Sequence, residues 1–300
     1  MPYINVNDVY IMDNTGKQVD DAVDYALANS NRNLLDNPWF RIDQRSVSGT
    51  ITSGYIADRW SISYGSGGVT ASRTADSVTV KSTSGSSHGD VVQRMEKSLF
   101  DFLLGKTVTA SVMRSDGSIV WKSYTFTSSA SSTTIGVDLD GNPINFRAYQ
   151  TSTYQDVQFW KFYTAGTFKA VKLELGSYST LANDVPPDYG EELRKCKYYF
   201  ERVKTAGNTL SLGIGYNDGY NTMYGVMKIE PKMVTPSLSG SSLLIGTTSL
   251  NTTSSSKSIY SFGSDGTAVI QIVATNAFST NQPYRFGLPA NGYIDFSADL

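Results

Sequence analysis

The segment from Lys169 to Arg202 reads KAVKLELGSYSTLANDVPPDYGEELRKCKYYFER and shows how the chain is divided. A strand-like run, residues 168–175, ends at Gly176. Pro186 and Pro187 then interrupt regular structure, because proline lacks an amide donor and restricts the residue before it. The pattern predicts that one sheet domain closes, a rigid joint follows, and a second sheet domain opens.

The joint itself carries a short helical signal. Residues 191–196 run from acidic to basic and predict one or two helical turns, with Glu191 placed to pair with Lys195 four residues later. Cys196 is the one cysteine of the chain, which excludes an internal disulfide and a cysteine-based zinc site within one chain. We expect its side chain to be a small buried hydrophobe in the joint helix.

Short β-strands are predicted on both sides of the joint. Apolar and polar residues alternate with a period of two, and turn signals such as Asp116-Gly117 and Asn291-Gly292 recur along the chain. A helical turn is expected over residues 95–104, ending at Gly105. We expect an all-β fold of two β-sandwich domains. Hairpins are expected to pair residues 107–112 with 119–126, 156–164 with 168–175, 209–215 with 220–230, 258–262 with 267–274, and 284–288 with 293–297.

Residues 1–32 form a separate N-terminal segment, predicted to be an extended arm followed by a helix. Thr15 and Gln18 fit a capping box at the helix start. A helix of about a dozen residues is marginal alone in water, so its apolar face must pack on its own domain or on the same helix of sibling chains. Because the helix precedes the first domain, packing against the same helix of sibling chains is favoured. The apolar face consists of Val19, Ala22, Val23, Ala26 and Leu27.

Composition excludes several classes of function. Charged residues make up only 17% of the chain and the formal net charge is −2. Lys and Arg occur singly, so nucleic acid is not an expected partner. No apolar run approaches the roughly 20 residues of a membrane helix, and the N-terminus lacks the pattern of a secretory signal. We expect a protein made in a cytoplasm, without membrane insertion.

The sequence contains no catalytic motif. His88, the one histidine, lies in a Ser/Gly-rich stretch and is interpreted as a solvated loop residue. Asp138 and Asp140 precede Gly141 in a reversal signature and are interpreted as a polar turn. A calcium site there is the weaker alternative, because the spacing of an EF-hand is missing. We therefore expect no catalytic residue and no cofactor.

Aromatic residues are the best candidates for ligand binding. Trp39, Trp60 and Trp160 lie in alternating apolar strands and are expected in the core. Trp121 follows a turn and is expected to face outward. A second group surrounds one turn and combines aromatic with hydrogen-bonding side chains, as a recognition loop would; half-buried strand tyrosines are the alternative. That group is Tyr216, Asn217, Asp218, Tyr220 and Tyr224.

The joint resembles one found in bacteriophage tail-fibre and receptor-binding proteins. The shared order is KLELG, small residues, Asn-Asp, Pro-Pro, Glu-Glu-Leu, Cys and Tyr-Tyr-Phe, within residues 172–200. Residues 33–40 (NLLDNPWF) and 57–60 (ADRW) are similar to the opening of the same jelly roll, and residues 292–300 (GYIDFSADL) resemble the usual ending.

The resemblance implies a jelly-roll domain of carbohydrate-binding type over residues 33–186 and a C-terminal β-sandwich over 187–300. It also implies a homotrimer, with residues 1–32 used for oligomerisation or for attachment to other virion proteins. The expected function is a non-catalytic virion fibre or receptor-binding component that attaches to a host cell-surface polysaccharide. The alternatives are a polysaccharide depolymerase and a head fibre or decoration protein that acts as a structural spacer.

Overall fold

The computed structural model describes most of the chain between residues 31 and 299. The described ranges are 31–64, 69–82, 88–127, 131–137, 141–150, 155–162, 165–218, 221–247, 249–275, 278–279 and 282–299. The predicted N-terminal arm and helix, with Val19, Ala22, Val23, Ala26 and Leu27, lie outside the described residues.

The fold is all-β, as predicted, and the chain divides into two compact units. The N-terminal unit comprises Met1–Arg41, Val47–Ile56 and Trp60–Pro187. The C-terminal unit comprises Asp188–Leu300 together with two short earlier segments, Ile42–Ser46 and Ala57–Arg59. The chain therefore contributes to the C-terminal unit twice before it completes the N-terminal one.

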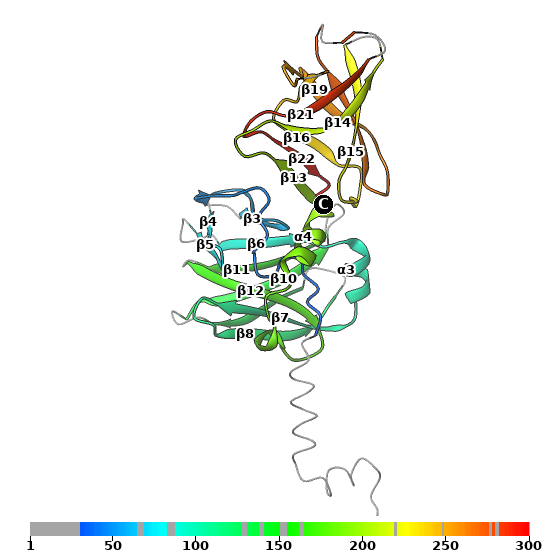
Figure 1. Ribbon diagram of the computed structural model, residues 1–300. Coiled ribbons are helices and arrows are strands. Elements are labelled where there is room, and N and C mark those ends of the chain that lie inside the picture. Colours follow the sequence, from blue (N-terminus) through cyan, green and yellow to red (C-terminus); the bar gives the residue numbers. More distant parts are fainter. Residues whose placement is uncertain are drawn as a thin grey trace, which may run out of the picture. The chain divides into compact units, whose positions relative to one another are not determined.

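The N-terminal unit is a sandwich of two six-stranded antiparallel sheets (Figure 1). The first sheet has the order β1-β4-β5-β12-β7-β8 and the second has the order β2-β3-β6-β11-β10-β9. The chain passes repeatedly from one sheet to the other, as in a jelly roll. The bounds are β1 Thr50–Ile51, β2 Gly54–Ala57, β3 Trp60–Tyr64, β4 Val69–Arg73, β5 Val78–Ser82, β6 His88–Arg94, β7 Thr107–Arg114, β8 Ile119–Thr125, β9 Ser131–Val137, β10 Pro143–Gln150, β11 Gln155–Phe162 and β12 Gly166–Leu175.

Aromatic side chains fill the space between the two sheets. Trp60 is fully buried, with its ring centroid 5.2 Å from that of Phe40 and 6.3 Å from that of Phe159. The ring of Tyr124, from the first sheet, lies 5.6 Å from that of Phe146 in the second. Such offset contacts are favourable between rings. These rings form part of the core between the two sheets.

The predicted short helix is present as α3, Lys97–Leu103. Phe100 and Leu103 face the core, where the ring of Phe100 lies 4.8 Å from that of Phe126. Gly105 follows with φ of +74°, which glycine adopts without strain. The helix covers one end of the sandwich.

Strands β11 and β12 do not form the predicted hairpin. β11 pairs with β6 and β10 in the second sheet, whereas β12 pairs with β5 and β7 in the first. The connection at Ala165–Gly166 therefore carries the chain across the sandwich. The prediction was wrong because a short Gly-containing connection serves both a hairpin and a crossover, and only nonlocal pairing distinguishes them.

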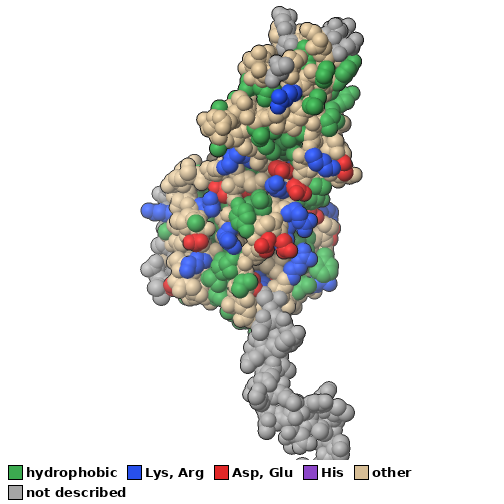
Figure 2. Space-filling model, in the orientation of Figure 1, with side chains coloured by type: hydrophobic (Ala, Val, Ile, Leu, Met, Phe, Trp, Pro, Cys, Tyr) green, Lys and Arg blue, Asp and Glu red, His purple; other side chains and the backbone are tan. Residues whose placement is uncertain are grey.

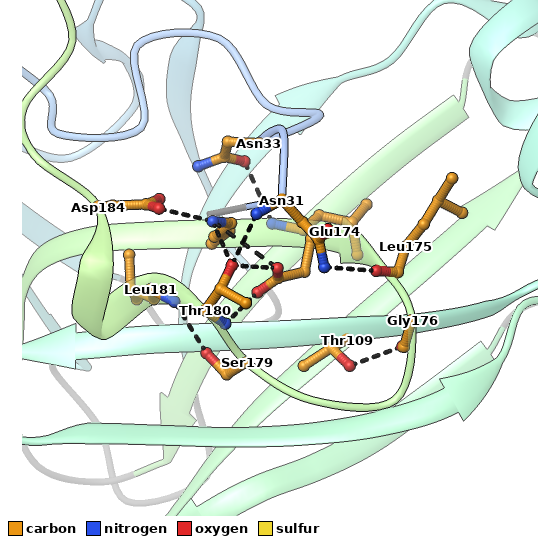
Figure 3. A network of polar contacts seen from close by, with 12 residues as sticks. Asn31, Asn33, Thr109, Glu174, Leu175, Gly176, Ser179, Thr180, Leu181 and Asp184 are labelled. Atoms are coloured by element: carbon orange, nitrogen blue, oxygen red, sulfur yellow. Dashed lines mark hydrogen bonds and ion pairs between the residues drawn. The ribbon is translucent and has the colours of Figure 1, made fainter. Parts of the chain in front are cut away.

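A buried polar network lies where the segment that follows β12 packs over the first sheet (Figure 3). Lys172 is fully buried, and its Nζ lies 2.6 Å from Asp184 Oδ1 and donates to Thr180 Oγ1 at 2.9 Å. Glu174, also fully buried, accepts from the Thr180 backbone amide at 2.8 Å and from its hydroxyl at 2.5 Å. The carboxylate of Glu174 is 3.7 Å from Lys172 Nζ.

The network ties the joint to the start of the domain. Thr180 precedes the 3₁₀ turn η1, Leu181–Asn183. The Asn31 amide donates to Thr180 Oγ1 at 3.0 Å, and Asn33 Nδ2 donates to the carbonyl of Val171 at 2.9 Å. These contacts give a structural reason for the spacing of Lys172, Glu174 and Asp184 in the quoted segment.

The joint helix is α4, Tyr189–Lys197. The Asp188 side chain caps it by accepting from the Glu191 amide at 2.9 Å. Lys195 pairs with Glu192 at 3.1 Å, and not with Glu191 as the spacing suggested. Cys196 is fully buried, as predicted.

The C-terminal unit contains a three-stranded sheet, β13-β22-β16, and a seven-stranded sheet, β18-β17-β21-β14-β15-β20-β19. Ile294 and Phe296 of the smaller sheet pack in one core with Met223, Ile270 and Phe286 of the larger one. The bounds are β13 Phe200–Lys204, β14 Leu210–Asn217, β15 Thr222–Lys228, β16 Ser237–Gly240, β17 Leu244–Gly246, β18 Thr252–Thr253, β19 Ser256–Phe262, β20 Thr267–Val273, β21 Pro283–Leu288 and β22 Tyr293–Ser297.

Two of the three hairpins predicted in this unit are confirmed and one is wrong. β14 pairs with β15 and β19 pairs with β20. β21 and β22 lie in different sheets, although Asn291 adopts φ of +58° between them. Asn291 Oδ1 accepts from the Gly207 amide at 2.9 Å. The turn at Asn291 therefore leads the chain from the seven-stranded sheet to the three-stranded one.

The two early segments of the C-terminal unit are held by charged and aromatic contacts. Arg45 lies 3.2 Å from Asp58, forms an ion pair with Asp299, and stacks 3.5 Å from the ring centroid of Phe200. Gln44 Nε2 donates to the Phe200 carbonyl at 2.7 Å. These contacts hold residues of the ADRW stretch and the chain's last described residues in the same unit.

Candidate ligand-binding site

The second sheet of the N-terminal unit carries a cluster of polar and aromatic side chains on the face opposite its core. Successive strand residues point to opposite faces, so Phe146 and Phe159 enter the core while their neighbours face away. Register places Trp160 opposite both Asp90 and Asn145. The cluster, called the polar face below, consists of Asp90 and Arg94 on β6, Asp156, Gln158 and Trp160 on β11, and Asn145, Arg147 and Tyr149 on β10.

A chain of hydrogen bonds orders the centre of the polar face. Arg147 Nη2 donates to Gln158 Oε1 at 2.6 Å, and Gln158 Nε2 donates to the Tyr149 hydroxyl at 3.1 Å. That hydroxyl makes a long bond of 3.5 Å to Asp156 Oδ2. Arg94 Nε lies 3.7 Å from Asp156 Oδ1. The chain fixes the Arg147 and Asp156 side chains, the two charged ends of this network.

Two donors of the polar face are buried without an acceptor. Arg147 Nε and Asn145 Nδ2 have no hydrogen-bond partner, although Asn145 Oδ1 accepts from Thr134 at 3.1 Å. Asn145 is 9% exposed. A buried donor without a partner costs about 1–3 kcal/mol, and such atoms mark places where a ligand or water supplies the missing acceptor.

The guanidinium of Arg147 lies over two aromatic rings. Its Cζ is 4.7 Å from the ring centroid of Tyr149 and 5.4 Å from that of Trp160. Among the described residues, no carboxylate lies within ion-pair distance of Arg147. A half-buried cation is thus held by rings and one amide oxygen.

Burial shifts both carboxyl groups of the polar face toward their neutral forms. It raises the pKa of Asp90 to about 7, with Arg147 opposing part of the rise. It raises the pKa of Asp156 to about 6, against the opposing effects of Arg94, the Tyr149 hydroxyl and Arg147. Desolvation of a charged carboxylate is the dominant cause at both positions.

The spacing of the two carboxyl groups argues against hydrolysis. Asp156 is level with Arg94, four residues beyond Asp90 on β6. Four strand residues span about 13 Å. Glycosidase carboxylates lie about 5 to 10 Å apart, so the face suits hydrogen bonding and stacking better than acid–base chemistry.

Trp121, the predicted outward-facing tryptophan, lies on β8 and is 40% exposed. Its ring centroid is 6.0 Å from that of Tyr178, which is 69% exposed. The structure therefore gives Trp121 an aromatic neighbour but does not bring it to the polar face, because β8 belongs to the other sheet.

The predicted recognition loop is split by the fold of the C-terminal unit. Tyr216 is 60% exposed, whereas Asn217 is fully buried and donates to the Ser279 carbonyl at 2.9 Å. Asp218 is exposed, and Tyr220 lies outside the described residues. Tyr224 is half-buried, opposite Tyr216. Asn217 thus has a structural contact, while the two tyrosines belong to a sheet face.

That sheet face is notably apolar. Cross-strand register places Ile214 opposite Val226, and both are more than half exposed. Tyr260, 64% exposed, packs edge-on against Tyr224 with ring centroids 4.8 Å apart. Figure 2 shows hydrophobic side chains among uncharged polar ones on this unit.

The weaker chemical candidates gain no support. Asp138 and Asp140 lie outside the described residues. His88 begins β6, opposite Phe162, so it is a strand residue and not a loop residue as predicted. Within the part of the chain that the structure describes, no group of three His, Cys, Asp or Glu side chains is placed to hold a metal.

The polar face was missed at the sequence level, although a signal for it exists. Residues 145, 147 and 149 and residues 156, 158 and 160 are polar or aromatic at every second position. Trp160 was expected in the core; it is 8% exposed but lies on the opposite side of the sheet from Phe159. Period-two spacing puts each set on one face, but only the pairing of β10 with β11 joins them.

Comparisons with known proteins give no identification. No family model, no curated protein and no solved structure matches the chain. Among the described residues, no helix has the length and apolar character needed to cross a bilayer.

Proposed function

We propose that this protein is a non-catalytic phage virion component, a fibre or receptor-binding protein that attaches to a host surface glycan through the polar face. The observation that carries the proposal is the set of side chains there: two rings, two guanidinium groups, two amides and two carboxyl groups on one sheet face. Sugars are bound by hydrogen bonds to their hydroxyls and by stacking of their apolar faces on aromatic rings. The resemblance of residues 172–200 to a fibre joint supports the virion assignment.

Homotrimeric assembly is part of the proposal. Several copies of a weak site raise overall avidity without new contacts. The predicted amphipathic helix within residues 1–32 is the proposed contact between chains, with attachment to other virion proteins through the same segment. A spacer that binds no glycan is the remaining structural alternative.

A polysaccharide depolymerase is the second candidate, since Asp90 and Asp156 both have raised pKa values. Their separation favours binding without cleavage. The two candidates are distinguished by incubating the protein with host capsule or wall polysaccharide. Retention of the polysaccharide without release of reducing ends supports attachment, whereas turnover that is lost in Asp90→Asn would establish the enzyme.

The binding experiment uses a glycan array and then calorimetry on the hits. Trp160→Ala is expected to weaken binding by roughly tenfold or more, because Arg147 loses a ring that holds its guanidinium in place. Trp121→Ala, on the other sheet, is the matched control and is expected to leave affinity unchanged. Equal loss in both variants would place the site elsewhere, and an array without hits would favour the spacer.

A further inference from the structure

The positive charge and the hydrogen-bond donors of Arg147 indicate which class of glycan would bind, provided that the polar face is the glycan site proposed above. Arg147 is half-buried on β10, and among the described residues its Nη2 donates one hydrogen bond, to Gln158 Oε1 at 2.6 Å. Its Nε has no hydrogen-bond partner, and no carboxylate of the described residues lies within ion-pair distance. The guanidinium therefore retains unused donors on one edge.

We propose that the polar face binds an acidic glycan, one whose sugar carries an oxyanion that Arg147 receives. A guanidinium presents paired N–H groups that match a carboxylate or phosphate, and such charge-assisted bonds are about twice as strong as neutral ones. A neutral sugar hydroxyl would satisfy a single donor and leave the charge unpaired. A carboxylate or phosphate satisfies both needs at once.

The neighbours of Arg147 position the guanidinium for an anion. The ring centroids of Tyr149 and Trp160 lie 4.7 and 5.4 Å from its Cζ, and Gln158 Oε1 accepts a hydrogen bond from its Nη2. Asn145, on the same strand two residues earlier, has a buried Nδ2 without a partner. Arginine and asparagine thus present donors side by side along β10.

The carboxyl groups of the face are compatible with an anionic ligand. Asp90 and Asp156 lie on the neighbouring strands β6 and β11, and neither forms an ion pair with Arg147 among the described residues. Burial favours their neutral forms, so repulsion of the ligand is weakest in mildly acidic solution. Arg94, at the edge of the face, adds a second cation 3.7 Å from Asp156.

The experiment compares three sets of oligosaccharides on the full chain: uronic-acid oligosaccharides, their carboxyl-reduced counterparts, and phosphorylated oligosaccharides. We expect binding of at least one acidic set and a loss of roughly 10- to 100-fold on carboxyl reduction or dephosphorylation. Whether the carboxylated or the phosphorylated set binds identifies the oxyanion. Binding should weaken as the pH rises from 5.5 to 8.

Three variants test the role of Arg147. Arg147→Gln is expected to remove the preference for the acidic sets, and Arg147→Lys to retain part of it, because the charge remains but the paired donors are lost. Lys122→Gln removes an exposed positive charge from β8 of the other sheet and is expected to have no effect. His88→Gln tests whether the histidine at the start of β6 causes the pH dependence. Thermal unfolding of each variant confirms that it is folded.

The outcomes separate this inference from the proposed function. Equal binding of acidic and carboxyl-reduced sugars, lost in Trp160→Ala, would overturn the inference and leave glycan attachment in place. Unchanged selectivity in a folded Arg147→Gln would overturn it as well. Absence of binding to every set would overturn both.

Discussion

A buried lysine is the centre of the polar network in the N-terminal unit. Lys172 is fully buried between Glu174 and Asp184, and a buried pair that loses one partner leaves an uncompensated charge. The packing of the joint over the first sheet therefore requires a lysine at position 172.

Replacing Lys172 with methionine is expected to lower the free energy of unfolding of the N-terminal unit by about 3–5 kcal/mol. All four tryptophans of the chain lie in that unit, so urea unfolding followed by tryptophan fluorescence measures it. Lys122→Met, at an exposed position on β8, is the control and should change stability by less than about 0.5 kcal/mol. Similar values for both variants would contradict the role of the network.

Asp90 gives the N-terminal unit a pH-dependent stability. Its folded pKa of about 7 exceeds the ordinary value of 3.8, so between these pH values the folded state binds more protons. Stability should therefore fall as the pH rises from about 4 to 7, by an amount of the order of 1–3 kcal/mol. Asp90→Asn should flatten this part of the profile, measured by the same fluorescence at pH 5 and pH 8. An unchanged profile would assign the effect to another group.

At the level of single residues, the sequence indicated the polar face only in part. The alternation of Asn145, Arg147 and Tyr149 is readable, as is that of Asp156 and Gln158. This alternation does not reveal which face of each strand packs into the core, since both faces contain aromatic residues. The raised pKa values depend on burial, which the pairing of distant strands creates.

Among the elements, local turns were predictable and crossovers were not. The Asp-Gly turn between β7 and β8 and the turns of β14–β15 and β19–β20 form hairpins as expected. The connections from β11 to β12 and from β21 to β22 instead change sheets. A tight turn fixes the local reversal of the chain, whereas the choice of sheet depends on which face is apolar and on partners far away in sequence.

The seven-stranded sheet depends on glycines beneath one aromatic ring. A Cβ on Gly225 of β15 would lie 2.4 Å from Phe286 Cε1, and one on Gly213 of β14 would lie 2.9 Å from it. Phe286 is fully buried, so it has no room to move away. Replacing Gly225 with alanine is expected to destabilise the C-terminal unit by about 1–3 kcal/mol through overpacking.

Differential scanning calorimetry would measure this loss as a lower melting temperature for the C-terminal unit. Val226→Ala is the matched control, since Val226 is the next residue of β15 but is 51% exposed. A Gly225→Ala variant as stable as this control would show that the ring moves aside.

For the whole molecule, the proposed assembly rests on the N-terminal segment. Deleting residues 1–32 is expected to convert the proposed trimer to monomers, because the apolar helix face would be the contact between chains. Multi-angle light scattering measures the mass, and deletion of residues 1–12, which removes the arm but leaves the predicted helix, is the control. A truncated chain that still forms the full oligomer would show that another surface organises it.

The C-terminal unit is built from three separate segments of the chain, and this limits how the molecule can be divided by recombination or engineering. Because Ile42–Ser46 and Ala57–Arg59 belong to it, a gene fragment that begins at Asp188 encodes an incomplete body that lacks Arg45 and Asp58. A single nick in the joint would likewise leave the earlier segments bound to the unit they complete. Transferring the C-terminal unit intact would therefore require residues 42–46 and 57–59 together with Asp188–Leu300, and not a cassette cut at the two prolines.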